Sequence, residues 1–538
     1  MGTINSVTLE VISNSLLSIV EQMGVILTKT GYSTNIKERK DLSVALFDKN
    51  GKLITLAQHI PLHFSSLLGA VSEVLNKWNI NDIYEGDTFI GNDPYSGGGS
   101  HLPDIVLVKP VFYKGELIAF AVNTGHHADR NIRRSTIYDE GLRIPIIKLY
   151  EKDKLVKDVY DLIMLNFQLK EERKGDLRAQ LIANQFGENK IIELIDKIGI
   201  DTYTDFCREW LKYGERKARQ SIKQLPDGIY EFEDYLDDDG NKTEDLLIKL
   251  KIIIQGEKID FDFTESCEQV TGSFNCIRNA LLATVYYAVK CLMDNTMPAN
   301  AGAFESIDVT AREGTLVCST EPAPTQSRAT TTQRIADVIF GAFAKIDPIK
   351  VTAAGNGAVS FFNFSGFDSR TGKPYVYLET IGGGSGARFN KDGLDAVQVH
   401  MTNTSNLPVE ALEMEYPLLV EKYALAENSG GDGEYRGGLG IIRGIRILDE
   451  SKNTELLAAT ERTKTRPWGL LGGKYAAGAR LNVIRDGKRI NTLNKVNGFP
   501  LRADDLIELV TAGGGGYGDP SKRSVESRKK DIAEGKVK

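Results

Sequence analysis

The stretch from residue 101 to residue 127 constrains the fold of this chain most, because its pattern predicts a β-hairpin. Residues 105–112 form a nearly continuous apolar run, which is typical of a buried strand. Lys114 and Gly115 follow as a turn, and residues 117–123 return as the partner strand. The two ends of such a hairpin must lie side by side.

Histidines and a carboxylate stand at both ends of this hairpin. His101 and Asp104 precede or open the first strand, and His126 and His127 follow the second. The chain has 6 histidines, and only His400 lies outside residues 59–127. Because a register shift of one residue turns a side chain to the other face, alternation alone does not choose between His126 and His127.

Two imidazoles and a carboxylate form a ligand set that suits Zn²⁺, Mn²⁺ or Fe²⁺. His101, Asp104 and His126 would leave positions open for water or substrate, as a catalytic metal requires. The alternative is that these polar residues satisfy backbone groups at the hairpin end. Asp41, at the mouth of a second predicted hairpin over residues 42–56, is a candidate fourth ligand or general base. Taken alone, it also fits an ordinary turn residue.

Two other patterns point less clearly to chemistry. His59 and His63 have a spacing that suits two ligands on a helix, but Pro61 argues against a continuous helical face, so a substrate-facing or structural role is favoured. The glycine-rich segments 381–386 and 511–520 lack the Gly-Lys-Ser/Thr ending of a P-loop. We interpret both as tight turns where chains pack closely, with a nucleotide contact as the alternative.

The composition excludes several classes of protein. A net charge of −7 and a pI of about 5.7 argue against nucleic acid as a partner, because phosphate binding needs a concentrated basic surface. The 5 cysteines show no CxxC pair, which predicts reduced thiols in a cytoplasmic protein. We expect no signal peptide and no membrane association, since no run approaches about 18 apolar residues.

The patterns predict a large multidomain α+β chain with mixed sheets. The N-terminal α/β segment, residues 1–150, carries the candidate metal site and opens with an amphipathic helix over residues 6–30. Residues 151–226 are expected to be helical, residues 227–350 to form a mixed α/β domain, and residues 351–538 to be β-rich, with glycine loops and a C-terminal helix. Inside these segments we expect helices at 65–78, 162–186, 190–198, 203–222, 279–291 and 332–344, and strands within 228–263 and 304–320.

Several longer motifs resemble the hydantoinase B/oxoprolinase family. They are Gly91-Asn92-Asp93-Pro94-Tyr95, His101-Leu102-Pro103-Asp104, Gly125-His126-His127-Ala128-Asp129, Glu140-Gly141-Leu142-Arg143-Ile144-Pro145, Asn300-Ala301-Gly302-Ala303-Phe304 and Gly518-Asp519-Pro520. The resemblance covers nearly the whole chain. It implies a large subunit that works beside a hydantoinase A-like partner, which binds ATP and Mg²⁺ and phosphorylates the substrate.

The resemblance also implies a set of site residues. In such relatives the divalent metal is held by the His-x2-Asp pair and by the first histidine of the paired motif, here His101, Asp104 and His126. Asp41 matches a Glu-Arg-x-Asp segment and is the fourth candidate. His127 occupies a position where relatives carry Trp, so we expect no ligand role for it.

One segment departs from the family pattern. Relatives follow Ala-Asp with glycine-rich and Pro-Gly-Ser segments, whereas this chain places Arg130, Arg133 and Arg134 there. This basic segment could hold an anionic intermediate. It fits a surface loop or a subunit contact equally well, and it puts the substrate in question more than the metal.

Three functions follow from these patterns and the resemblance. The first is the metal subunit of an ATP-dependent hydrolase of cyclic amides such as hydantoins, 5-oxoproline or lactams, in a hetero-oligomer, with Asp41 or Asp129 as the base. The second is the metal subunit of an ATP-dependent ketone carboxylase, similar to those acting on acetone or acetophenone. The third is a non-catalytic scaffold with a structural metal. An open ligand set argues against the third, because structural sites are usually closed.

Overall fold

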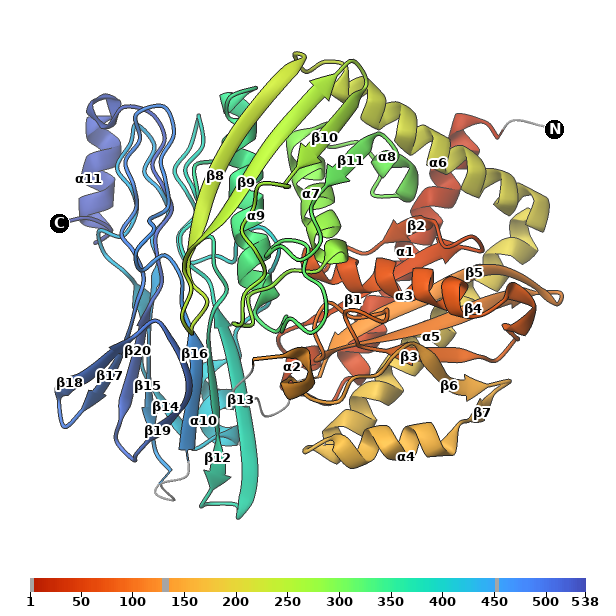
Figure 1. Cartoon of the computed structure of the whole chain (residues 1–538), viewed down its shortest axis with the longest axis horizontal. Helices are drawn as coiled ribbons and strands as arrows, with labels where there is room; N and C mark the ends of the chain where they lie inside the picture. Colours follow the sequence, from red (N-terminus) through yellow and green to blue (C-terminus); the bar gives the residue numbers. More distant parts are fainter. Residues whose placement is uncertain (1–3, 128–134, 450–453) are drawn as a thin grey trace.

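The computed structural model describes residues 4–127, 135–449 and 454–538. The described residues therefore exclude Asp129 and the basic side chains of Arg130, Arg133 and Arg134. The structure does not test the roles that the sequence suggested for these four residues. Within the described ranges the strands form sheets of seven, four, four and five strands, with helices packed around them (Figure 1). The expected α+β class is confirmed.

The N-terminal part is built on a seven-stranded sheet in the order β2-β1-β5-β4-β3-β6-β7. Its strands are β1 (Leu42–Asp48), β2 (Leu53–Leu56), β3 (Thr88–Gly91), β4 (Asp104–Tyr113), β5 (Glu116–His126), β6 (Ile147–Glu151) and β7 (Lys154–Leu155). Val44 and Leu46 pack with α1 (Ser6–Thr30) and α5 (Lys170–Ile198), whereas Phe47 packs with α3 (Phe64–Lys77). Helices thus bury this sheet on both faces.

The predicted hairpin is present as β4 and β5, and its register brings the two ends together. Asp104 pairs with His126 across the hairpin. On the other side of β5, Leu42 of β1 pairs with Gly125, and the N–H of His126 donates to the carbonyl oxygen of Asp41 at 3.0 Å. The backbone of His126 therefore lies between those of Asp41 and Asp104.

The central helices break at a different place from the one expected. They are α4 (Lys157–Asn166), the continuous α5, and α6 (Ile200–Ile222). The expected helix over 162–186 is interrupted after Asn166, and the expected break before Lys190 is absent. Gly187 lies inside α5 because it packs against α1, where an added Cβ would lie 2.5 Å from the Met23 Sδ. This tertiary contact outweighs the low helix propensity of glycine.

A second, mixed sheet follows in the order β11-β10-β9-β8. Its strands are β8 (Gly228–Asp238), β9 (Glu244–Gln255), β10 (Lys258–Asp262) and β11 (Ile307–Thr310), and β10 and β11 pair in parallel. Helix α9 (Arg328–Phe343) packs on β8 and β9 and against α7 (Arg278–Leu292). Within 304–320, where we expected strands, β11 alone forms a strand. The chain beyond Thr310 continues through turns, one of which has Gly314 at φ +80°.

The C-terminal part consists of two antiparallel sheets that share one core (Figure 1). One contains β12 (Ser360–Asp368), β13 (Lys373–Ile381), β16 (Thr454–Ala459) and β19 (Lys495–Leu501). The other contains β14 (Leu418–Leu425), β15 (Ile441–Ile447), β17 (Arg480–Arg485), β18 (Lys488–Leu493) and β20 (Leu506–Val510). Buried Phe362 and Phe364 of the first sheet pack with Ile445 of the second. The shorter helices are α2 (Thr34–Lys37), α8 (Ala301–Phe304), α10 (Val409–Glu415) and α11 (Val525–Ala533).

The glycine-rich segments pack against one another through their backbones. Gly384 N–H donates to the Ala512 carbonyl at 3.0 Å, and Gly514 N–H donates to the Gly438 carbonyl at 2.8 Å. A Cβ on Gly384 would lie only 2.0 Å from the Gly438 oxygen. The expected close packing is present, but the segments associate by lateral backbone contact and not through tight turns.

Gly384→Ala is therefore expected to destabilise the chain by about 1–3 kcal/mol or more, because its neighbours are backbone atoms that cannot move aside. Gly444→Ala in β15 is the matched control, since its nearest neighbour is the Lys422 Cβ at 3.3 Å. Its stability should stay within about 1 kcal/mol of the parent. Thermal unfolding of both variants measures the difference, and equal losses would contradict the packing argument.

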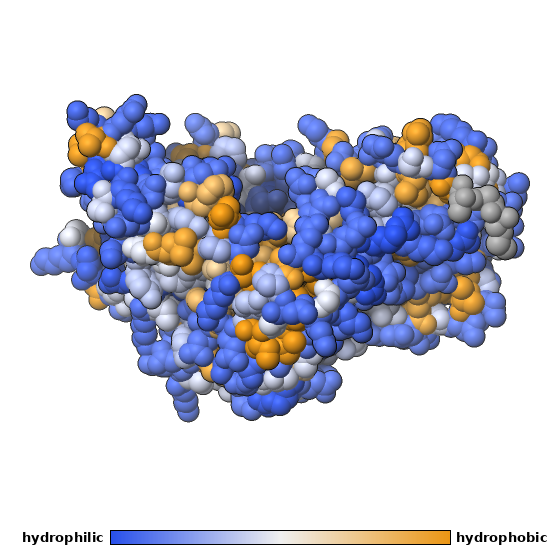
Figure 2. Space-filling view, turned by 90° about the horizontal axis from the view of Figure 1, so that it is seen from above, coloured by the Kyte–Doolittle hydropathy of each residue, from blue (hydrophilic) through white to orange (hydrophobic). Residues whose placement is uncertain are grey.

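Helix α1 is long and apolar enough to cross a membrane by length and composition alone. It nevertheless buries one face against the sheet, including Leu16, Met23 and Leu27. A core helix passes the same test, so this property carries little weight. Figure 2 shows one face of the molecule, where the surface is mainly hydrophilic and apolar residues gather in separate patches.

Candidate metal site

Three potential metal ligands converge at the paired end of β4 and β5. His101 lies in the loop before β4, Asp104 begins β4, and His126 ends β5. Each offers one ligand atom, and these atoms lie within 4.8 Å of one another. All three residues are buried. The hairpin register explains why residues more than twenty positions apart in the sequence meet here.

The His/Asp cluster, defined as His101, Asp104 and His126, contains three buried polar atoms without a hydrogen-bond partner, whereas His126 Nδ1 lies 3.3 Å from the Asn35 side-chain nitrogen. His101 Nε2 lies 3.0 Å from Asp104 Oδ1, but neither of these atoms nor His101 Nδ1 makes a hydrogen bond. Leaving a buried polar atom without a partner costs about 1–3 kcal/mol. Two ligand atoms at right angles, each about 2.1 Å from one ion, are about 3.0 Å apart. The arrangement therefore fits a divalent metal.

His63 connects Asp41 to this cluster. Its Nε2 lies 3.3 Å from Asp41 Oδ1 and 3.5 Å from Asp104 Oδ1, and its Nδ1 lies 3.4 Å from the Ser43 hydroxyl oxygen. His63 is buried at the end of a short 3₁₀ helix that leads directly into α3. Asp41 thus adjoins the three ligands through His63, within reach of any group bound at their open side.

Arg328, the first residue of α9, neutralises Asp104 from the opposite side. Its Nη2 donates to Asp104 Oδ2 at 2.7 Å, and its Nε donates to the Ser100 hydroxyl oxygen at 2.9 Å. The Ser100 hydroxyl donates in turn to Asp104 Oδ2 at 3.2 Å. These contacts fix one carboxylate oxygen of Asp104 and leave the other, Oδ1, facing His101.

Burial and neighbouring charges set the protonation of the site. Burial alone would raise the pKa of Asp104, but the positive charges of His101, His63 and Arg328 hold this pKa well below its usual range. Asp41 behaves similarly, because its interactions with His126 and His63, which include a hydrogen bond from His63, outweigh burial and lower its pKa. Burial lowers the pKa of His126 to about 3. At neutral pH the carboxylates are therefore ionised and His126 is neutral, which are the forms that bind metals.

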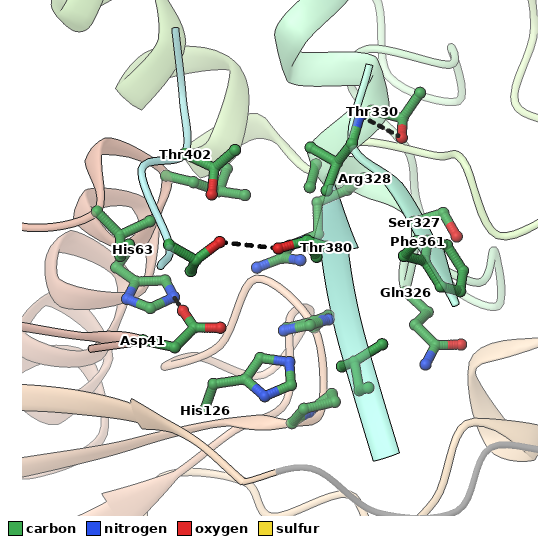
Figure 3. A pocket seen from close by; sticks show the side chains of 18 residues that line it. Asp41, His63, His126, Gln326, Ser327, Arg328, Thr330, Phe361, Thr380 and Thr402 are labelled. Atoms are coloured by element: carbon green, nitrogen blue, oxygen red, sulfur yellow. Dashed lines mark hydrogen bonds and ion pairs between the residues drawn. The ribbon is translucent and has the colours of Figure 1, made fainter. Parts of the chain in front are cut away.

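A cavity of about 100 Å³ opens on Asp41, His101 and His126. Figure 3 shows Asp41, His63 and His126 on the side of the N-terminal strands, with Arg328 and Thr330 of α9 and Thr380 of β13 across from them. The remaining walls are largely apolar or carry hydroxyl groups: Ile60, Leu62, Pro103, Val359, Phe361, Leu378, Thr402 and Thr404. The site therefore lies where the N-terminal sheet, α9 and the C-terminal sheet β13-β12-β16-β19 meet.

His127 lies away from the cluster, as we expected from the resemblance. Its Nε2 lies 2.9 Å from the Gln180 side-chain oxygen on α5, and its ring stacks on Phe167 at 6.0 Å. His59 also lies apart from the cluster, and its side chain does not point to the same neighbours as that of His63. It packs against α1, where a Cβ on Gly24 would lie 2.3 Å from the His59 Cε1.

His59 should make stability depend on pH. Burial, followed by the like charge of His63, lowers the pKa of His59 to about 4 from an ordinary value near 6.5. The unfolded chain then binds a proton that the folded chain excludes, so stability falls as pH drops from about 6.5 toward 4, by on the order of 1 kcal/mol per pH unit. Thermal unfolding of the parent and of His59→Gln at several pH values measures this slope. If stability fell with pH equally steeply in His59→Gln and in the parent, His59 would not be a source of this pH dependence.

The fold and site define a large α+β subunit with a buried His/Asp cluster beside a cavity. The hydantoinase B/oxoprolinase family matches residues 5–520, and the chain belongs to this family. The sequence is 38% identical over 547 residues to an uncharacterised protein of Methanocaldococcus jannaschii, covering 99% of this chain and 94% of that one. It is 34% identical over 564 residues to a putative D-/L-hydantoinase component of a Pseudomonas species, covering 99% and 93%.

Two solved structures share the fold. The ATP-dependent caprolactamase from Pseudomonas jessenii superposes with a TM-score of 0.91 at 29% identity, over 100% of this chain and 95% of that one. A nucleotide-free acetone carboxylase superposes with a TM-score of 0.90 at 18% identity, over 99% and 78%. The relatives named as subunits of larger enzymes imply a partner subunit, and the family supports an enzymatic role for this chain.

Proposed function

We propose that this chain is the metal-binding subunit of an ATP-dependent cyclic amide hydrolase. The observation that supports this most is the buried His/Asp cluster: His101 and Asp104 carry polar atoms without a hydrogen-bond partner, and His101 and His126 line a cavity. Relatives named as subunits of a hydantoinase and of a caprolactamase favour a hydantoin or a lactam as the substrate. The metal would be Zn²⁺, Mn²⁺ or Fe²⁺, which all accept imidazole and carboxylate ligands.

His101, Asp104 and His126 would hold the metal, and Asp41 is the candidate fourth ligand. A bound divalent metal supplies Lewis acidity, which polarises a carbonyl group and lowers the pKa of a water molecule. Arg328 holds Asp104 Oδ2, so that Oδ1 is presented to the cluster. The protein thus fixes its acidic ligand before any substrate enters.

Asp41 is also the candidate general base. Its lowered pKa keeps the carboxylate ionised at neutral pH, and His63 at 3.3 Å is placed to share a proton with it. Burial opposes protonation of His63, but the charges of Asp104 and Asp41 raise its pKa above the ordinary value. Protonated His63 would therefore donate a hydrogen bond to Asp41 and hold this carboxylate in the ionised form that a general base needs.

The cavity walls would shield the reacting groups from bulk water. Leu62, Phe361 and Leu378 provide apolar surface, while Thr380 and Thr404 bond to each other at 2.8 Å and present hydroxyl groups. Such walls strengthen electrostatic interactions inside the site and exclude competing reactions. They suit a small, mainly apolar substrate with one or two polar atoms.

The proposal places ATP and Mg²⁺ on a hydantoinase A-like partner subunit. The partner would phosphorylate the amide oxygen, and the activated substrate would then reach the cavity. All 5 cysteines are free, which is consistent with the cytoplasmic location that we propose for the complex.

The small volume of the cavity favours a second candidate, the metal subunit of an ATP-dependent ketone carboxylase. A cavity of about 100 Å³ accommodates a molecule the size of acetone more readily than a substituted ring. The fold that this chain shares with an acetone carboxylase is consistent with this candidate. A scaffold role remains the third candidate, and the open side of the cluster argues against it.

Reconstitution with the partner subunit tests these candidates. With ATP present, the hydrolase should open a hydantoin, 5-oxoproline or a lactam without bicarbonate. The carboxylase should hydrolyse ATP only when a ketone and bicarbonate are both supplied. Bicarbonate-dependent ATP hydrolysis with a ketone would overturn the hydrolase proposal, and a complex that turns over neither substrate class would favour the scaffold.

A further inference from the structure

A second cavity, separate from the His/Asp cluster, has a volume of about 730 Å³. Its walls come from α7, α9 and the segments 349–355 and 385–400. None of its lining residues lines the smaller cavity, although one segment supplies His400 to this cavity and Thr402 to the other. Its volume falls within the range of about 300–1,000 Å³ that small-molecule sites occupy.

The charged side chains that line this second cavity are all basic. They are Lys350, Arg388 and Lys391, and no carboxylate lines it within the described part of the chain. Arg388 and Lys391 have no ion-pair partner among the described residues, and Lys350 has only a 3.9 Å contact with Asp347. Three like charges around one cavity create a positive local potential, which attracts an anionic ligand.

The nearest acidic residues in the sequence are already engaged elsewhere. Asp392 accepts hydrogen bonds from Arg523 at 2.8 Å. Asp395 lies 3.3 Å from Arg436 and 3.1 Å from Lys536. Apart from the 3.9 Å contact between Lys350 and Asp347, the described residues therefore give the basic side chains of the cavity no ion pair. The segment 388–395 contributes basic side chains to the cavity, whereas its acidic side chains bind other partners.

A rigid polar chain forms part of the wall. His400 adopts φ +50°, a left-handed conformation that costs a residue other than glycine about 1–3 kcal/mol. Its side chain is 7% exposed, and its Nε2 lies 3.1 Å from Asp337 Oδ1. The Tyr287 hydroxyl oxygen lies 3.5 Å from His400 Nδ1. In the tautomer of His400 that carries a proton on Nε2, this N–H donates to Asp337 and Nδ1 accepts from the Tyr287 hydroxyl. These two hydrogen bonds stabilise His400 in its strained backbone conformation.

The geometry points to a binding site for a phosphate-bearing small molecule in this second cavity. A phosphate group carries about two negative charges, which match several basic side chains better than the single charge of one carboxylate, and the guanidinium fork of Arg388 can hold two of its oxygens. Exposed Phe389 and Leu394 and buried Val399 supply apolar wall for a ring or an alkyl portion. Inorganic phosphate and a nucleoside phosphate would both present a phosphate group to the basic side chains. Only the nucleoside phosphate has a ring system that could contact the apolar wall.

Titration calorimetry on the full chain tests the site with three probes: ADP, inorganic phosphate and succinate. We expect ADP to bind, and Arg388→Gln to weaken its binding at least about tenfold. If ADP bound more tightly than inorganic phosphate, the adenine base and the ribose of ADP would be the groups that contact the apolar wall. Lys154→Gln is the matched control, because it removes one positive charge from exposed β7 and should leave ADP affinity unchanged.

Three results would overturn the proposal. They are the absence of binding by both ADP and phosphate, equal ADP affinity in the parent and in Arg388→Gln, and succinate binding as tight as that of ADP. Thermal unfolding should show that Arg388→Gln folds normally, since Arg388 has no ion-pair partner within the described residues. The outcome is independent of the proposed metal function, because His101→Ala should retain ADP binding even if it loses all turnover.

Discussion

Replacing His101 by alanine is expected to remove the bound metal and to lower the kcat/KM of the assembled enzyme by more than about 100-fold. Loss of an outer partner of a metal ligand already costs about 10–100-fold, and His101 is a direct candidate ligand. The chain should stay folded, because neither ring nitrogen of His101 makes a hydrogen bond that the substitution would break. Metal analysis, turnover of the reconstituted complex and thermal unfolding measure the three effects.

His126 and His127 provide a matched pair for this prediction. His126→Ala should lose metal as His101→Ala does, because both side chains belong to the cluster. His127→Gln should retain metal and turnover, because His127 bonds to Gln180 and stacks on Phe167 away from the cluster. Full metal content and normal turnover in His101→Ala, or loss of metal in His127→Gln alone, would contradict the assignment.

The proximity of the three candidate ligands was predictable from the sequence because local rules bring them together. An apolar run, a Lys-Gly turn and a second apolar run define a hairpin, and a hairpin places its two ends side by side. His101, Asp104 and His126 therefore needed no knowledge of the rest of the fold. Choosing His126 over His127 needed the family resemblance, since a shift of one residue in register would exchange them.

The other half of the site could not be predicted in this way. Arg328 lies 224 residues after Asp104, and no local pattern connects the start of a buried helix to a distant strand. The spacing of His59 and His63 suggested two ligands on one helix face. Pro61 interrupts this helical pattern, and the two histidines contact different neighbours. The length of α5 likewise depends on the contact of Gly187 with Met23. Helix propensity is a property of single residues, so it gives no information about such a tertiary contact.

Arg328→Met is expected to destabilise the metal-free chain by about 3–5 kcal/mol, the usual cost of removing one partner of a buried ion pair. Asp104 would then keep its buried charge with only Ser100 and the histidines beside it. In the metal-loaded chain the loss should be smaller, because the metal would balance the same carboxylate. Added Zn²⁺ or Mn²⁺ should therefore raise the unfolding temperature more in Arg328→Met than in the parent.

Two companion variants separate charge from packing. Arg328→Lys keeps the charge but loses the fork that reaches both Ser100 and Asp104, so its metal-free loss should be intermediate. Adding Asp104→Asn to Arg328→Met removes the stranded charge and should restore part of the metal-free stability while abolishing the response to metal. If Arg328→Met lost the same stability with and without metal, Arg328 would act by packing alone, and Asp104 would not be the residue that the metal and Arg328 both neutralise.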